Sequence, residues 1–222
     1  PLDLLATGRS QLAELPSVRL VGGEATRVDE DLTVTLADGS ELAPRAVVLA
    51  TGADYAVPDV PGIAELWGTA VIHCPFCHGW ESRDSRIGLL VASEEHADHL
   101  VPMLSRLSSD IETFDSLAGV RAHDGGILVA TADGDEVERD VLFVAAPPKP
   151  RDTAFAHLSL ERDEAGAVVV DPFGRTAVKG LYAAGDVVPG PQAVVQALAT
   201  AQRAAVGVTR DLTAAATAPS AG

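Results

Sequence analysis

The sequence has few of the features that mark secreted or membrane proteins. Its only two cysteines share one Cys-x-x-Cys, so the chain cannot build the spread disulfide framework of a secreted scaffold. No apolar run approaches the ~18 residues that cross a bilayer, and no charged-then-apolar leader is present. The sequence predicts a soluble globular protein of a reducing compartment, with the cytoplasm as the default location and no membrane partner.

Basic residues are also scarce. Lys and Arg number 16 against 32 Asp and Glu, which gives a formal net charge of -16. The acidic residues are dispersed rather than gathered in a tail, so they are compatible with a simple role in solubility. A surface of this sign repels polyanions, and it argues against nucleic acids and anionic membranes as partners.

A long internal repeat is present. The stretch "LTVTLADGSELAPRAVVLATG" (32–52) aligns without a gap with "ILVATADGDEVERDVLFVAAP" (127–147). Each copy predicts a strand, an Asp-Gly hairpin turn, a polar return and a buried apolar strand, "AVVLA" or "VLFVA". The chain is therefore predicted to contain the same unit, a hairpin followed by a buried strand, twice.

The segments around the two copies differ. Before the second copy, strand 86–92, helix 93–107 and strand 111–114 predict a βαβ unit. Before the first copy there is one helix-like stretch, and then short strands that begin at "VRLV" (18–21). If the copies are equivalent, the first lacks its opening βαβ unit.

Two proline clusters, "VPDVPG" (57–62) and "PPKP" (147–150), predict the crossings, which are the two points where the chain passes from one domain to the other. The predicted segments are 1–60, 61–149 and 150–222. The last contains a strand that ends in Gly185-Asp186, a Pro/Gly loop, an alanine-rich helix that starts near Gln192, and a tail (213–222) expected to be disordered.

The stretch "HCPFCHGWE" places Cys74 and Cys77 between His73 and His78. A Cys-x-x-Cys at a helix start or beside a cation is shifted toward thiolate, as redox exchange requires. Either histidine could stabilise that thiolate or relay its proton. The alternatives are that two small residues simply pack, or that the cysteines form a Cys₂His₂ zinc site with His96 and His99. The buried-strand sequence between the pairs favours the redox interpretation, with no metal.

Together these features resemble the low-molecular-weight thioredoxin reductase family of FAD-dependent pyridine nucleotide-disulfide oxidoreductases, and "CPFCHGWE" is similar to its dithiol oxidase branch. "ATG" (50–52), the Cys-x-x-Cys, "GLYAAGD" and "PQA" (191–193) carry the resemblance in the family's order. It implies an α/β fold of two Rossmann-like, three-layer domains, with the FAD-binding domain discontinuous around an inserted NAD(P)-binding-like domain.

The resemblance also implies roles. Cys77 would pass electrons to the flavin and Cys74 would exchange with substrate. His78 would act as acid/base, with His73 as second choice. Thr51, Gly52, Gly185, Asp186, Gln192 and Ala193 would bind FAD, although each singly also suits an ordinary turn or helix start. The family further implies a homodimer.

The glycine-rich GxGxxG that would hold the FAD pyrophosphate is missing before Pro1. We therefore expect the FAD domain to lack its N-terminal βαβ half, through truncation, and the 222 residues alone to retain FAD weakly and to be inactive as a fragment.

An NADPH site is not indicated in the inserted domain. The turn after strand 86–92 reads "ASEEHAD", with Glu94 and Glu95 in place of glycines, and no basic cluster follows strand 111–114. Without nicotinamide, molecular oxygen is the simplest acceptor. The sequence thus predicts oxidation of a small-molecule dithiol or a thioredoxin-like protein by oxygen. The alternatives are an NADPH-dependent thioredoxin-disulfide reductase and a non-catalytic remnant or metal-binding module.

Overall fold

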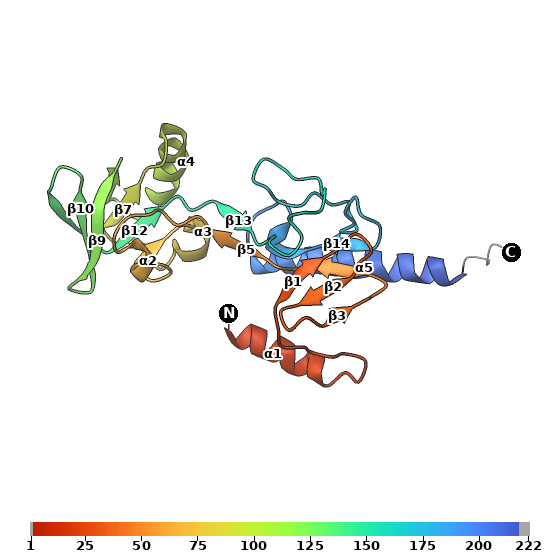
Figure 1. The fold of residues 1–222 in the computed structure, drawn as a ribbon. Coiled ribbons are helices and arrows are strands. Elements are labelled where there is room, and N and C mark those ends of the chain that lie inside the picture. The colour runs from red at the N-terminus through yellow and green to blue at the C-terminus, as the bar shows by residue number, and fades with distance from the viewer. Residues whose placement is uncertain (1, 218–222) are drawn as a thin grey trace. The chain divides into compact units, whose positions relative to one another are not determined.

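The computed structural model describes residues 2–217 and divides the chain into two compact units (Figure 1). Unit 1 combines Pro1–Ala53 with Pro150–Gly222, and unit 2 is Asp54–Lys149. The first crossing thus precedes the predicted boundary at residue 60. The reason is that Val57 and Val60 pack against a core cluster of unit 2.

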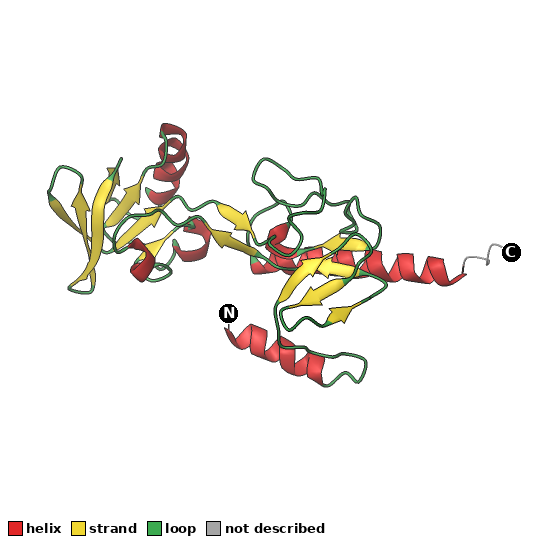
Figure 2. Cartoon of the chain, viewed as in Figure 1, coloured by secondary structure: helices red, strands yellow, loops and turns green. Residues whose placement is uncertain are grey.

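Unit 1 contains two helices, five strands and one 3₁₀ turn among its described residues (Figure 2). They are α1 (Leu2–Ala13), β1 (Ala25–Val28), β2 (Val34–Leu36), β3 (Glu41–Leu42), β4 (Val47–Leu49), β14 (Leu181–Ala183), η1 (Gly185–Val187) and α5 (Val194–Thr217). Strands β1, β2 and β3 form an antiparallel meander, and β4 pairs in parallel with β14. At the crossings, β5 (Ala53–Tyr55) pairs with β13 (Pro148–Pro150).

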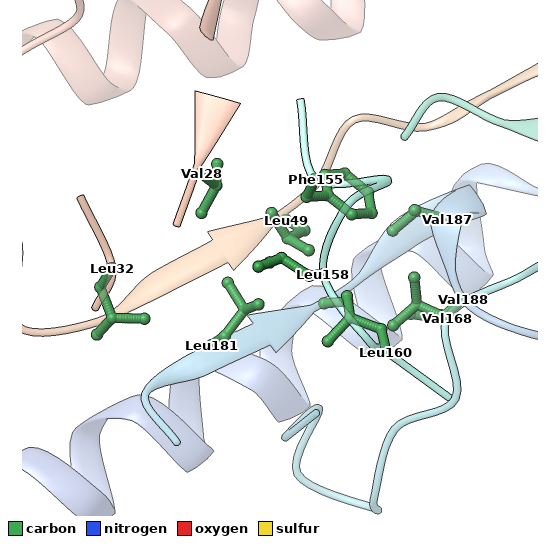
Figure 3. Close-up of a cluster of buried hydrophobic side chains, with 11 residues drawn as sticks. Val28, Leu32, Leu49, Phe155, Leu158, Leu160, Val168, Leu181, Val187 and Val188 are labelled. Carbon is green, nitrogen blue, oxygen red and sulfur yellow. The ribbon is translucent and has the colours of Figure 1, made fainter. Parts of the chain in front are cut away.

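The alternating side chains of β14 separate two apolar clusters. Leu181 and Ala183 join a core that includes Leu49 and Phe155 (Figure 3). Tyr182 and Ala184 point to the other face, where they pack with Ala204 of α5. Because strand side chains alternate between faces, one short strand supports both layers.

Unit 2 is built on a four-stranded parallel sheet in the order β6-β12-β7-β8, with an antiparallel meander β11-β10-β9 beside it. Its elements are α2 (Ile63–Leu66), β6 (Val71–Ile72), α3 (Pro75–His78), β7 (Ile87–Leu90), α4 (Glu94–Leu104), β8 (Ile111–Phe114), β9 (Leu117–His123), β10 (Gly126–Thr131), β11 (Glu136–Arg139) and β12 (Val141–Val144). The predicted βαβ unit is therefore confirmed as β7, α4 and β8.

Strand β12 is buried on both faces. Val141 and Phe143 face the cluster that contains Leu100 and Leu104 of α4. Leu142 and Val144 face the cluster formed with the meander. This three-layer arrangement explains why "VLFVA" reads as a continuous apolar run.

The copy of this strand in unit 1 is only partly buried, which corrects the prediction for "AVVLA". Leu49 lies in the core, but Val48 is 42% exposed. The physical reason is that β4 has one strand neighbour, β14, and a covered face on one side only.

Two further expectations were wrong in part. Residues 18–21 form no strand, because pairing begins only where Ala25 lies opposite Leu36. The predicted disordered tail begins too early, because α5 continues to Thr217, where Thr217 Oγ1 donates to the carbonyl of Thr213. Alanine, the best helix former, fills this last turn. Residues 218–222 of the predicted tail lie outside the described residues.

A charged network fixes α5 to the loop that precedes β14, residues 171–180. Arg175 donates two hydrogen bonds of 2.7 Å to the carboxylate of Asp211, and the hydroxyl of Tyr182 donates to the same carboxylate at 2.6 Å. Arg175 first and Tyr182 second hold the pKa of Asp211 well below its usual range. Burial and the carboxylate raise the pKa of Tyr182 to about 12, so the phenol stays a hydrogen-bond donor.

Gly207 allows α5 to approach that loop closely. A Cβ at this position would lie 2.4 Å from the carbonyl oxygen of Phe173. Gly207→Ala should therefore lower the free energy of unfolding by about 1–3 kcal/mol through overpacking, although alanine is the better helix former. Urea unfolding followed by circular dichroism measures this loss. Gly8→Ala in α1 is the matched control, since it meets open space. Equal effects of the two changes would contradict the prediction.

No helix among residues 2–217 is both long enough and apolar enough to cross a membrane.

Candidate functional site

The two cysteines form a free dithiol at the start of α3. Cys74 follows strand β6 as the N-cap residue, and Pro75 at the first helical position presets the helical φ. The backbone N–H groups of Cys77 and His78 both donate to the carbonyl of Cys74 at 3.1 Å. This tight turn places Cys77 Sγ 2.8 Å from Cys74 Sγ. The sulfurs need to approach by less than ~1 Å to reach the disulfide bond length of about 2.0 Å.

The two sulfurs are hydrogen-bonded to each other. The Cys77 thiol donates its hydrogen bond to Cys74, and this bond, partial burial and the charge of Cys74 raise the pKa of Cys77 to about 11. The predicted shift toward thiolate is therefore not found at Cys77. Cys77 keeps its proton, and Cys74 is the sulfur that accepts the hydrogen bond. Cys74 is half-buried, while Cys77 is exposed.

His73 lies in an aromatic cluster that the sequence did not reveal. Its ring stacks on Trp67 at a centroid distance of 5.4 Å and lies 4.1 Å from the ring of Tyr55. Burial first and repulsion by His78 second lower the pKa of His73. A lowered pKa leaves the imidazole neutral at neutral pH, so His73 is poorly suited to stabilise a thiolate as a cation.

His78 is the last residue of α3, and one of its ring nitrogens is buried without a hydrogen-bond partner among the described residues. Its carbonyl accepts hydrogen bonds from the backbone N–H and the hydroxyl of Ser82, which fixes the backbone at this point. Its Nδ1 is buried and has no hydrogen-bond partner within residues 2–217. An unpartnered buried nitrogen costs free energy, so its retention in the residue that follows Cys77 is consistent with a proton-relay role.

The predicted FAD residues of unit 1 meet at one edge of the parallel pair β4–β14. Register pairs Ala183 with Leu49, so the chain that follows each strand emerges at the same carboxyl edge. Gly52 and Gly185 both have positive φ, and a Cβ at either would enter open space. Ligands of parallel sheets bind at this edge, and the backbone here is free to approach one.

Other residues complete that edge. Asp186 is half-buried in η1, and Thr51 is exposed after β4. Thr200 of α5, which the sequence did not single out, accepts a hydrogen bond from the N–H of Gly185 at 2.9 Å. Its hydroxyl fixes the backbone of η1 against α5.

The N-terminus of α5 belongs to the same unit. The helix begins at Val194, two residues after the predicted start, and the carbonyl of Ala193 accepts its first hydrogen bond from Ala197. Gln192 lies just before the helix, where its side chain donates to the carbonyl of Gly190. A helix of this length presents a positive dipole end and free N–H groups, which suit a reduced, anionic flavin. The donors and open backbone of this edge therefore fit the flavin half of FAD.

The position expected for nicotinamide is a cleft without cations. A cavity of about 400 Å³ lies at the carboxyl ends of β7, β8 and β12, between residues that include Val60, Ala92 and Asp115. Among the described residues 2–217, no Lys or Arg lines this cavity. The turn into α4 uses Ser93 as N-cap, whose hydroxyl accepts from the N–H of His96. This hydroxyl and the glutamates of the first turn occupy the helix end where a diphosphate would bind.

The two histidines of the alternative zinc site lie on α4. His96 Nδ1 accepts a hydrogen bond from the N–H of Ala92 at 3.3 Å, and His99 is exposed. Burial and repulsion by His99 lower the pKa of His96. Within residues 2–217, no group of three or more His, Cys, Asp or Glu side chains is arranged to hold a metal ion.

Comparisons with known proteins agree on one family. The family model for pyridine nucleotide-disulphide oxidoreductases matches residues 91–201. Thioredoxin reductase tcpT of Claviceps purpurea is 32% identical, over 84% of this chain and 70% of its own length. Thioredoxin reductase sirT of Leptosphaeria maculans is 33% identical, over 81% and 67%.

A solved structure extends the similarity to the fold. The crystal structure of HlmI has a TM-score of 0.86 and 30% identity to this chain, and the match covers 96% of this chain and 76% of that one. The predicted α/β fold class, with dinucleotide-binding domains, is confirmed by this match.

Proposed function

Because the chain belongs to the pyridine nucleotide-disulphide oxidoreductase family, among its thioredoxin reductase-like members, we propose that it oxidises dithiols to disulfides with molecular oxygen as the final acceptor. Members of this family are oxidoreductases that bind FAD, and some also use NADPH. The overall reaction converts one dithiol and one O₂ into one disulfide and one H₂O₂. Two electrons and two protons pass from sulfur to oxygen.

The observation that carries the proposal is the pair of sulfurs 2.8 Å apart, with the proton on Cys77. In the oxidised state the two sulfurs would be bonded. A substrate thiolate attacks Cys74 and releases Cys77, which takes up a proton. The second substrate thiol then displaces Cys74 as a thiolate. The reduced state left behind would contain the hydrogen bond described above, in which Cys77 donates to Cys74.

Proton transfer at Cys77 is the task that we assign to His78. The raised pKa of Cys77 means that its proton must be removed before this sulfur can react as a nucleophile. His78 is adjacent in the chain, and its buried Nδ1 has no competing partner within the described residues. His73 would support the site through its stacking rather than through its charge.

Thr51, Gly52, Gly185, Asp186, Gln192 and Ala193 would hold FAD. The cofactor, when bound, supplies a two-electron acceptor for the dithiol. The contribution of this chain is an open backbone at Gly52 and Gly185 and the positive end of α5. Small-molecule dithiols or a thioredoxin-like protein would be the substrates, and the protein would act as a homodimer.

Oxygen uptake tests the proposal directly. With dithiothreitol and the FAD-loaded holoprotein, we expect one O₂ to be consumed for each thiol pair lost, and NADPH to leave the flavin absorbance unchanged. The physical reason is that the cleft of unit 2 offers carboxylates and no cation to a nucleotide phosphate. Stopped-flow bleaching of the flavin by NADPH within milliseconds, without oxygen uptake, would contradict the proposal.

A conventional NADPH-dependent reductase is the second candidate. The observation in its favour is the cleft itself, which lies at the strand edge where dinucleotides bind. The same stopped-flow measurement separates the two candidates, because only the reductase accepts electrons from NADPH.

A further inference from the structure

Two aromatic side chains beside the dithiol are strongly exposed. Phe76, between the two cysteines, is 87% exposed, and Trp80, three residues after Cys77, is 71% exposed. Aromatic residues make up only 4% of the chain, so two exposed aromatic residues at and just after α3 are not explained by a high aromatic content. Large exposed apolar groups next to reactive atoms mark a binding surface.

A groove adjoins the ring of Phe76. Its lining comes from the start of α3 and from the end of α4 and the turn after it: Pro75, Phe76, Pro102, Met103, Arg106 and Leu107. Its volume is about 480 Å³. Small-molecule sites typically enclose about 300–1,000 Å³, whereas a stable protein partner needs about 800 Å² of surface on each side. The size of the groove therefore favours a small molecule.

The surface is also locally cationic. The guanidinium of Arg83 lies 4.4 Å from the centroid of the Trp80 ring and donates to the Trp80 carbonyl at 2.8 Å. Arg106 lines the groove. Neither arginine makes an ion pair within residues 2–217, although Glu81 and Asp84 are exposed nearby in the chain. In a protein of formal net charge -16, two cations without an ion pair, one over the Trp80 ring and one in the groove beside Phe76, favour an anionic ligand.

We propose that Phe76, Trp80, Arg83 and Arg106 determine the substrate specificity of the dithiol, and that they select an aromatic or apolar thiol or disulfide that carries a carboxylate. This inference rests on the proposed function. The rings stack on the apolar body of the ligand, and the guanidinium groups bind its carboxylate. The surface is continuous with the site, because Phe76 is bonded to Cys77.

A pair of aromatic disulfides tests the inference on the reduced chain. Dithiobis(nitrobenzoate) carries two carboxylates, and dithiodipyridine is neutral. Cys74 displaces one aromatic thiolate and forms a mixed disulfide. Cys77 then displaces the second, so that one reagent is reduced to two thiols while the two cysteines are oxidised to one disulfide. Stopped-flow absorbance gives each rate, which is divided by the rate of free dithiothreitol with the same reagent.

The variants separate stacking from charge. Trp80→Ala should lower both rates about fivefold, which is the size of one aromatic contact. Arg83→Gln with Arg106→Gln should lower the rate of dithiobis(nitrobenzoate) about fivefold, with a loss of its salt dependence, and leave dithiodipyridine within about twofold. Trp80→Phe keeps an aromatic face and should stay near the wild type. Leu12→Ala and Arg9→Gln, exposed positions of α1 in unit 1, are the controls.

The outcomes are distinguishable. Failure of the wild type to release two thiols per chain would overturn the proposed function itself. Normal release with unchanged rates in the Trp80 and arginine variants would overturn only this inference. Sensitivity of those variants toward oxidised thioredoxin alone, with the two small reagents unaffected, would overturn it in favour of a protein partner.

Discussion

Serine at Cys74 or Cys77 is expected to lower dithiol turnover by more than about a thousandfold, because a hydroxyl is neither a thiolate nucleophile nor a partner in a disulfide. Oxygen uptake measures the loss. Since the cysteines lie at an exposed helix start, the fold should survive, and circular dichroism of each variant should match the wild type.

The two serine variants should fail at different steps. Cys77→Ser keeps the half-buried sulfur that accepts the hydrogen bond, and it should trap a mixed disulfide on Cys74 after treatment with dithiobis(nitrobenzoate). Cys74→Ser replaces that sulfur by a neutral hydroxyl and so removes the charge of Cys74, and the pKa of Cys77 should fall from about 11 toward the ordinary thiol value. Mass spectrometry detects the mixed disulfide of Cys77→Ser, and a pH titration of thiol reactivity measures the pKa of Cys77 in Cys74→Ser. Unchanged turnover in either variant would end the dithiol proposal.

His78→Gln should slow the step that deprotonates Cys77 by about a hundredfold, which is typical for loss of one general acid or base. A single-turnover measurement of the release of the second aromatic thiolate reports this step. Its pH profile should shift toward the pKa of Cys77, because hydroxide then replaces the imidazole as base.

His73→Gln is the matched control for that experiment. The ring of His73 is stacked on Trp67, and burial lowers its pKa, so its loss should change the rate by less than about fivefold. A larger effect for His73 than for His78 would reverse the assignment and make His73 the proton acceptor.

The repeat predicted much of the fold. Asp38-Gly39 and Asp133-Gly134 both lie in hairpin turns, and each hairpin leads into a parallel strand. Alternation, turn chemistry and buried runs are local signals, so the sequence showed them directly. The same local signals predicted the βαβ unit of unit 2 and a helix after Pro191.

The sequence could not show what depends on neighbours. "AVVLA" and "VLFVA" are equally apolar, but the burial of the equivalent residues Val48 and Phe143 differs because the neighbouring strands and layers differ. The position of the proton within the Cys74–Cys77 pair and the stacking of His73 on Trp67 depend on tertiary distances. The exposure of Phe76 and Trp80 was also hidden, since an aromatic residue in a sequence usually indicates core.

The insertion of unit 2 between β4 and β14 sets the order in which the chain can fold. These neighbouring strands are roughly 130 residues apart, so their pairing requires closure of a long loop and is slow to form from an extended chain. Unit 2 is one continuous segment of the chain, and its end strands β5 and β13 are paired. Once unit 2 is folded, the two arms of unit 1 leave it side by side, and the loop that β4 and β14 must close is effectively short.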